Sequence, residues 1–246
     1  MRYAVYRRNY AYGGRSQMTL TDTQRFLFDN RDDEYAAFSR RLLPETVPEQ
    51  VIGVRVPVLR TYAKSLRGTP AAEVFMHELP HMYHEENQIH MFLINEEKDH
   101  AAALSQLEDF MPYIDNWAVC DNYGSRAFKK HPEEVLAHIR KWIAGGRTYT
   151  VRYGIGLLMA DYLDASFDPE YIGIVTAVDS DEYYVNMMCG WYMATALAKQ
   201  PAAAMPYFTD CLMNETVWKM AVRKSVESFR VPDETKKLLR TLRYGK

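Results

Sequence analysis

Residues 77–81 (HELPH) have the letters of the H-E-x-x-H motif, in which two histidines bind zinc and the glutamate acts as general base. That chemistry requires both histidines on one face of an unbroken helix. Pro80 stands between them, and a proline inside a helix costs about 3 kcal/mol because it removes a hydrogen bond and clashes with the preceding turn. The segment is therefore predicted to be a helix end followed by a turn, and no metal site is predicted.

A second set of residues contains two aromatics, one acid and one arginine. Trp117 and Asp121 are four residues apart, so on a helix they would lie on one face, one turn apart. Arg152 falls near the start of a later helical segment, and Trp191 falls in the middle of another. Each also has a structural interpretation, because a helical tryptophan is usually core and an Asp–Arg pair between helices is usually a structural ion pair.

Other common catalytic and targeting patterns are missing from the sequence. It has no glycine-rich phosphate loop, no C-x-x-C and no G-x-S-x-G, so no cofactor is predicted. The three cysteines, an odd number with no pairing pattern, favour reduced thiols in a cytoplasmic protein. No apolar run approaches the ~20 residues of a membrane span. Residues 1–17 lack an apolar core, so we expect an N-terminal extension rather than a signal peptide, with one domain over residues 18–246.

The net charge of −2 conceals blocks of opposite sign. Residues 117–160 hold seven Lys or Arg against three Asp or Glu, residues 161–212 hold one against eight, and residues 213–246 hold nine against four. Such blocks fit a curved protein with one basic face and an acidic back, and they equally fit solvated helix surfaces with no preferred face. The first interpretation predicts that basic residues share the concave side with Trp117, namely Arg126, Lys129, Arg147, Arg223 and Lys224.

The elements that must position these residues are predicted to be helical throughout, because no strand alternation bounded by hairpin turns is seen. We expect helices over residues 33–43, 56–66, 70–79, 83–95, 99–110, 114–128, 132–143, 149–163, 169–178, 182–198, 201–211, 216–229 and 232–242.

Four of these helices begin at or near a proline, a position where the missing N–H has no helical partner. They are Pro132, Pro169, Pro201 and Pro232, at spacings of 37, 32 and 31 residues. Repeats of helical hairpins have this period, although no residue string recurs. The sequence therefore predicts an all-α fold, an α-α superhelix of HEAT-like antiparallel hairpins with a concave cleft. An irregular helical globule is the alternative.

Several segments, in chain order from about residue 33 to 240, resemble the DNA alkylation repair family, which includes the alkylpurine DNA glycosylases with HEAT-like repeats. One departure is Met187, where many relatives have lysine. The segments are residues 53–60 (GVRVPVLR), 83–85 (YHE), 116–121 (NWAVCD), 151–153 (VRY) and 187–191 (MMCGW).

This resemblance implies an enzyme that cuts the N-glycosidic bond of cationic N3- or N7-alkylated purines in duplex DNA, and we expect the protein to be a monomer. It assigns Trp117, Asp121, Arg152 and Trp191 to the cleft. Asp121 would stabilise the sugar cation and place a water, the tryptophan faces would hold the cationic nucleotide, and Arg152 would hold a phosphate. Two other functions use the same architecture: a non-catalytic module that binds damaged or branched DNA, and a protein–protein scaffold.

Overall fold

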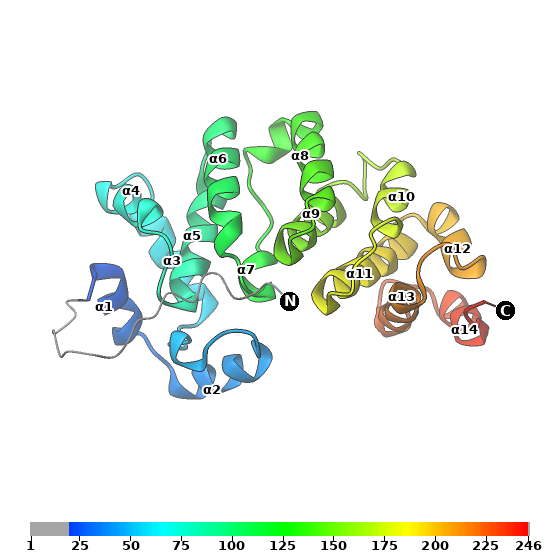
Figure 1. The fold of residues 1–246 in the computed structure, drawn as a ribbon, viewed down its shortest axis with the longest axis horizontal. Coiled ribbons are helices and arrows are strands. Elements are labelled where there is room, and N and C mark those ends of the chain that lie inside the picture. Colours follow the sequence, from blue (N-terminus) through cyan, green and yellow to red (C-terminus); the bar gives the residue numbers. More distant parts are fainter. Residues whose placement is uncertain (1–19, 246) are drawn as a thin grey trace.

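The computed structural model describes residues 20–245, and every regular element in that range is a helix. Figure 1 shows the helices following one another in chain order along an arch, from α1 at one end to α14 at the other. This arrangement confirms the predicted all-α superhelical fold. The predicted extension, residues 1–17, lies outside the described residues, and the single domain over residues 18–246 stays a prediction. Within the described residues, no helix has both the length and the apolar character of a membrane span.

The first half of the array contains α1 (Asp22–Asp29), α2 (Asp33–Leu42), α3 (Val56–Leu66), α4 (Pro70–His77), α5 (His84–Glu96), α6 (His100–Phe110) and α7 (Trp117–Cys120). The second half contains α8 (Pro132–Ala144), α9 (Thr148–Asp161), α10 (Glu170–Thr176), α11 (Tyr183–Lys199), α12 (Pro201–Thr209), α13 (Glu215–Glu227) and α14 (Asp233–Thr241). Short 3-10 turns cover Pro48–Gln50, Met111–Tyr113 and Phe128–Lys130.

Polar N-caps and prolines explain where many of these helices begin. Pro132 and Pro201 occupy the first turn of α8 and α12, whereas Pro169 and Pro232 are the N-caps of α10 and α14. Helix α1 was not predicted, although it begins with a capping box: the Thr21 hydroxyl accepts from the backbone N–H of Gln24, and the backbone N–H of Thr21 donates to the side-chain oxygen of Gln24. The predicted helices agree with the structure to within two residues at each end, apart from residues 114–128.

The prediction of one continuous helix over residues 114–128 is wrong. The structure has a single turn, α7, followed by an irregular segment that leads to the 3-10 turn Phe128–Lys130. Asn122 explains the early end, because its side-chain amide donates to the carbonyl oxygens of Ala118 and Val119 and so satisfies groups that a longer helix would have used. The backbone at Gly124 then has a φ of 134°, which a side chain disfavours.

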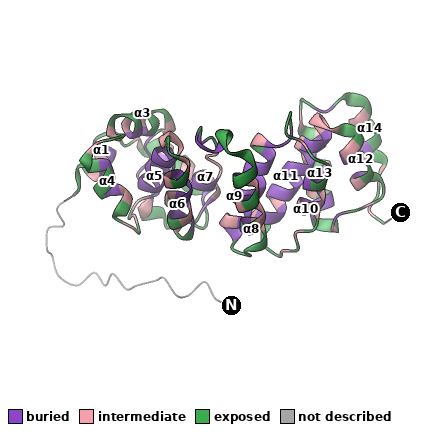
Figure 2. Ribbon diagram, turned by 90° about the horizontal axis from the view of Figure 1, so that it is seen from above, coloured by how far each residue is buried: buried purple, intermediate pink, exposed green. Residues whose placement is uncertain are grey.

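Helices α8 and α10 lie on the outer side of the arch, and α9 and α11 lie on its inner side (Figure 1). Helix α9 packs against both α8 and α11, and α11 packs in turn against α13, so the inner helices form a continuous row. Their interiors are accordingly apolar: α9 and α11 are mostly buried, as Figure 2 shows for α11. The first turns of α9, which carry Arg152, are therefore packed inside this row.

The core consists of two hydrophobic clusters that meet at α5. One contains Leu27, Leu59 and other residues of the N-terminal helices, and the other runs from α5 to α14. Residues of α5 belong to both clusters: Ile89 and Phe92 to the first, and Met91 to the second. Figure 2 shows α5 as an almost wholly buried helix in the middle of its neighbours. The buried helix α5 thus joins the two halves of the array, because it packs into both clusters.

The HELPH segment is a helix end and a turn, as its proline predicts. Helix α4 ends at His77, and the Leu79–Pro80 peptide bond that follows is cis. Nε2 of His81 lies 2.8 Å from Nδ1 of His90 on α5. Burial lowers the pKa of His81 to about 4, so this ring is neutral at pH 7 and belongs to the packing of α4 against α5.

Candidate functional site

Asp121 lies directly after α7, at a helix end that is tightly fixed. Asn116 caps the start of this single turn by accepting from the backbone of Val119, and the backbone N–H of Asp121 donates to the carbonyl of Trp117. The spacing predicted for Trp117 and Asp121 therefore holds, although the helix is only one turn long. Arg60 on α3 donates to Oδ1 of Asn122, which ties this turn to the N-terminal half.

Arg152, on the first turns of α9, is bound to Asp121 through both carboxylate oxygens. Nε donates to Oδ1 at 2.8 Å and Nη2 donates to Oδ2 at 2.6 Å, while Nη1 donates to the carbonyl of Tyr184 at 2.8 Å. The side chain of Arg152 is only 5% exposed. Burial alone disfavours its charge, but the hydrogen bonds and the negative charge of Asp121 outweigh burial and raise the pKa of Arg152. Three helices, α7, α9 and α11, are thereby joined at one ion pair.

Tyr123 supplies a third hydrogen bond to the carboxylate, from its hydroxyl to Oδ1 of Asp121 at 2.9 Å. Burial raises the pKa of Tyr123 well above its usual value, so the hydroxyl keeps its proton and acts as donor. The phenol fits because residue 156 of α9 is glycine: a Cβ at Gly156 would overlap the Tyr123 ring and hydroxyl. Gly156 therefore leaves room for the Tyr123 ring, whose hydroxyl orients Asp121.

The two carboxylate oxygens of Asp121 accept different numbers of hydrogen bonds. Oδ1 accepts from Arg152 and Tyr123, whereas among the described residues Oδ2 accepts only from Arg152. The side chain of Asp121 remains 16% exposed, more than that of its partner. A carboxylate oxygen can accept about two hydrogen bonds. Oδ2 thus retains a lone pair that a water or a positively charged sugar could approach.

Aromatic rings line the approach to this ion pair. Nε1 of Trp117 donates to the carbonyl of Leu42, which holds the indole against the end of α2. The hydroxyl of Tyr149 donates to Glu45, and its ring lies 5.9 Å from that of Tyr184. The guanidinium carbon of Arg152 lies 6.0 Å from the Tyr184 ring centre. The Asp–Arg pair is therefore contacted by the phenols of Tyr123 and Tyr184, with Tyr149 next to Tyr184.

Trp191 lies in the middle of α11, as the sequence predicted. It follows Tyr184 by seven residues, or about 10 Å of helix at 1.5 Å per residue. Its indole is 43% exposed and, among the described residues, it contacts no other aromatic ring. The structure thus brings Asp121 and Arg152 together, with Trp117 one turn before Asp121, and leaves Trp191 as an exposed residue farther along α11.

The basic residues predicted to share one face are dispersed and partly neutralised. Lys129 pairs with Asp161 at the end of α9, about 20 Å from Arg147 at the start of that 14-residue helix. Arg223 and Lys224 both pair with one acid, Glu227. Within residues 20–245, the exposed Arg126 and Arg147 make no ion pair. These two are therefore the predicted cations most open to a phosphate.

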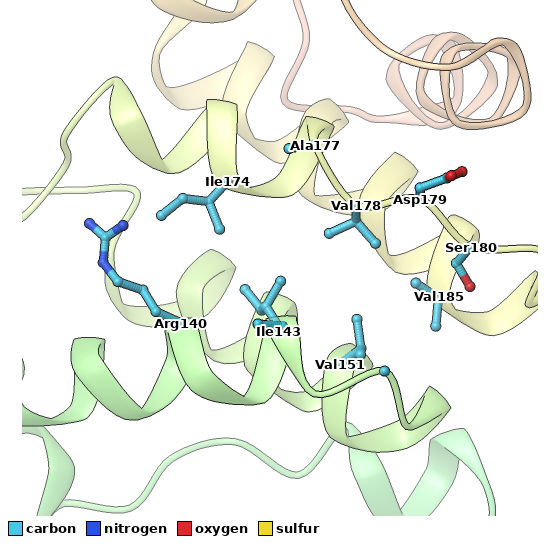
Figure 3. Close-up of a pocket in the computed structure, with 11 residues that line it drawn as sticks. Arg140, Ile143, Val151, Ile174, Ala177, Val178, Asp179, Ser180 and Val185 are labelled. Carbon is cyan, nitrogen blue, oxygen red and sulfur yellow. The ribbon is translucent and has the colours of Figure 1, made fainter.

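A pocket of about 460 Å³ lies elsewhere, between α8 and α10. Figure 3 shows Ile143, Val151, Ile174 and Val185 lining its apolar interior. Arg140 at its edge is held by Glu170 through two hydrogen bonds of 2.9 Å. The pocket lacks the converging polar groups of the Asp121 site, so the candidate site is not this pocket.

Sequence analysis missed four residues that support the site. They are not part of a motif with obvious chemistry, and only Arg60 stands in a segment whose family resemblance could have identified it. Glycine at position 156 also carries no local signal, because its role depends on a ring 33 residues earlier in the chain. The four residues are Glu45, Arg60, Tyr123 and Tyr184.

Comparison with known proteins identifies one family. Residues 23–227, most of the chain, match the family model described as DNA alkylation repair enzyme. A comparison with curated proteins gave no match.

Proposed function

Because the chain belongs to the DNA alkylation repair enzyme family, we propose that it is a DNA glycosylase that releases cationic N3- or N7-alkylated purines from duplex DNA. The observation that supports this most strongly is the Asp121 carboxylate. It is fixed by Arg152 and Tyr123 yet retains an unoccupied lone pair on Oδ2. A preorganised charge of this kind is what stabilises a developing cation, because no reorganisation is needed during the reaction.

Alkylation at N3 or N7 gives the base a positive charge and so makes it a good leaving group. The glycosidic bond breaks with its electron pair moving to the base, which departs neutral, while C1′ of the sugar becomes cationic. Oδ2 of Asp121 faces this cation and accepts a proton from the water that adds to C1′. A general acid is not required. The open faces of Trp117 and Trp191 hold the cationic nucleotide, each worth ~0.5–2 kcal/mol.

Arg152 is assigned to positioning Asp121 in this proposal. Three of its N–H groups are used inside the protein, and the side chain is 5% exposed. The phosphate contact suggested by the family resemblance passes instead to two exposed cations that lie five residues along the chain from the ion pair, Arg126 and Arg147. Phosphate contacts fix the register of the DNA, whereas the carboxylate acts on the sugar.

The test of this function is release of free base by the purified wild-type protein. Duplex DNA carrying 7-methylguanine is incubated with excess protein under single-turnover conditions, and free base is separated and quantified. We expect release well above the spontaneous rate. Tight binding of this duplex without release from it, or from DNA carrying 3-methyladenine, would instead establish a binding module.

One observation favours the second candidate function, a module that binds DNA without releasing a base. The Asp121–Arg152 pair is bidentate and largely buried, which is also the geometry of an ion pair with a purely structural role. Absence of both release and DNA binding at low salt would contradict both DNA functions and favour a protein–protein scaffold.

DNA affinity should fall steeply with salt if exposed cations contact phosphates. The log–log slope is ~0.9 per phosphate, so four contacts predict a loss of about 100-fold between 50 and 200 mM salt. Changing Arg126→Gln or Arg147→Gln should each lower the slope by about 1. Arg140→Gln is the control, because Arg140 lies on the outer helix α8 and is held by Glu170. Fluorescence anisotropy with a labelled duplex measures the DNA affinity of wild type and the three variants over a range of salt concentrations. If Arg126→Gln and Arg147→Gln have the same salt slope as wild type, these arginines do not contact phosphates.

A further inference from the structure

Two histidines and one glutamate lie together where α6 and α8 begin. His100 is the first residue of α6, His131 is the N-cap of α8, and Glu134 lies in the first turn of α8. One ligand atom from each lies within 4.8 Å of the other two. We propose that these three residues form a binding site for a divalent transition metal such as Zn²⁺.

The distances between the donor atoms suit a tetrahedral ion. Nε2 of His100 lies 3.1 Å from Oε2 of Glu134, and Nδ1 of His131 lies 3.5 Å from the same oxygen. Zinc ligands at about 2.0–2.2 Å in tetrahedral geometry are separated by about 3.3–3.6 Å. The distance to His131 is in this range, and the distance to His100 is slightly shorter, so a small outward shift of the carboxylate would admit the ion.

His100 is the observation that points to a missing ligand. Its side chain is 10% exposed, and the ring packs on Phe128 and His131. Among the described residues, neither of its ring nitrogens makes a hydrogen bond, even though Oε2 of Glu134 is close. Buried polar groups usually have a hydrogen-bond or metal partner, and Nε2 of His100 has none within residues 20–245. A lone pair directed at an ion between the ligands, rather than at the oxygen itself, satisfies it.

Binding requires one adjustment. The rings of His100 and His131 stack at 4.2 Å with an angle of 20° between planes, and nearly parallel rings cannot both aim a lone pair at one ion. His131 is 47% exposed and Glu134 is 65% exposed, so both can turn while the buried His100 stays fixed. The bound ion would join the start of α6 to the start of α8.

The donor set also selects the metal. Two imidazoles and one carboxylate suit Zn²⁺, Cu²⁺ or Ni²⁺, whereas Mg²⁺ and Ca²⁺ prefer an all-oxygen shell. The positive ends of two helices oppose any cation, which further disfavours ions held only by charge. We therefore expect Zn²⁺ to bind and Mg²⁺ and Ca²⁺ not to compete with it.

The test is metal binding by tag-free, chelator-treated protein, followed by calorimetry with Zn²⁺ alone and by the visible spectrum with Co²⁺ alone. Wild type should bind one ion per chain, show tetrahedral Co²⁺ bands and gain thermal stability with Zn²⁺. His131→Asn keeps a good N-cap, and Glu134→Gln keeps the side-chain shape. Each should weaken Zn²⁺ binding by about 100-fold or more, since even residues outside the ligand set change affinity by ~10–100-fold.

His138→Gln provides the matched control. His138 is also on α8 and lies 3.1 Å from a glutamate, Glu108, but within residues 20–245 that pair has no third ligand, and Glu108 already holds the ammonium of Lys141. This variant should bind Zn²⁺ like wild type. Absence of stoichiometric Zn²⁺ binding by wild type, or equal affinity in His131→Asn and Glu134→Gln, overturns the proposal, and neither outcome depends on base release.

Discussion

Asp121→Asn is expected to slow the release of 7-methylguanine by about 10²–10³-fold, the usual effect of removing one preorganised stabilising group. The substitution keeps the shape of the side chain and leaves an oxygen that Arg152 can still contact. It removes the negative charge that the proposed sugar cation requires. Single-turnover release from duplex DNA measures the effect directly, because saturating protein removes any contribution from weaker binding.

Two control variants separate this loss from a general disturbance of the fold. Asp161→Asn changes an aspartate of similar exposure, 19% against 16%, that pairs with Lys129 at the opposite end of α9. It should release base at the wild-type rate. Tyr123→Phe keeps the charge of Asp121 but removes one hydrogen bond that orients it, so its rate should fall between those of wild type and Asp121→Asn. An undiminished rate in Asp121→Asn would remove this carboxylate from the mechanism.

The fold was largely predictable because helix boundaries depend on local signals. Prolines and polar caps mark most helix starts, and these signals act within a turn of the residue concerned. The exception, residues 114–128, shows where local signals fail. Its apolar spacing is helical, yet Asn122 turns back to close α7, and Asp121 is held by a residue 31 positions away. A local bond from Asn122, which the apolar spacing does not reveal, ends this helix, and a distant partner fixes the residue that follows it.

For the candidate site, the sequence predicted the identities of some residues but not their contacts or burial. Trp117, Asp121 and Arg152 do come together, but the sequence could not indicate that Arg152 uses both carboxylate oxygens or is buried. Nor could it indicate Tyr123, whose position depends on the small size of Gly156 across the packing of the chain. Charge blocks were a poor guide for the same reason: ion pairs with Asp161 and Glu227 neutralise cations that the sequence counts as free.

Arg152→Ala is expected to lower the free energy of unfolding by about 3–5 kcal/mol, the cost of leaving one partner of a buried ion pair uncompensated. The change would remove two hydrogen bonds to Asp121 and one to the carbonyl of Tyr184, and so loosen the junction of α7, α9 and α11. Urea denaturation followed by circular dichroism measures the loss. Base release should fall as well, because Asp121 would no longer be oriented.

The role of Arg152 is decided by comparing this variant with two others. Arg140→Ala removes an equally bidentate arginine, but its pair with Glu170 is exposed, so stability should change little. The double variant Asp121→Asn, Arg152→Ala should be less destabilised than the sum of its parts, because neither charge is left alone. If Arg152 were instead a phosphate clamp, Arg152→Ala would weaken DNA binding while leaving the unfolding free energy within about 0.5 kcal/mol of wild type, as is usual for surface substitutions. The buried geometry predicts the opposite pattern, a large loss of stability with most of the DNA affinity of the folded protein retained.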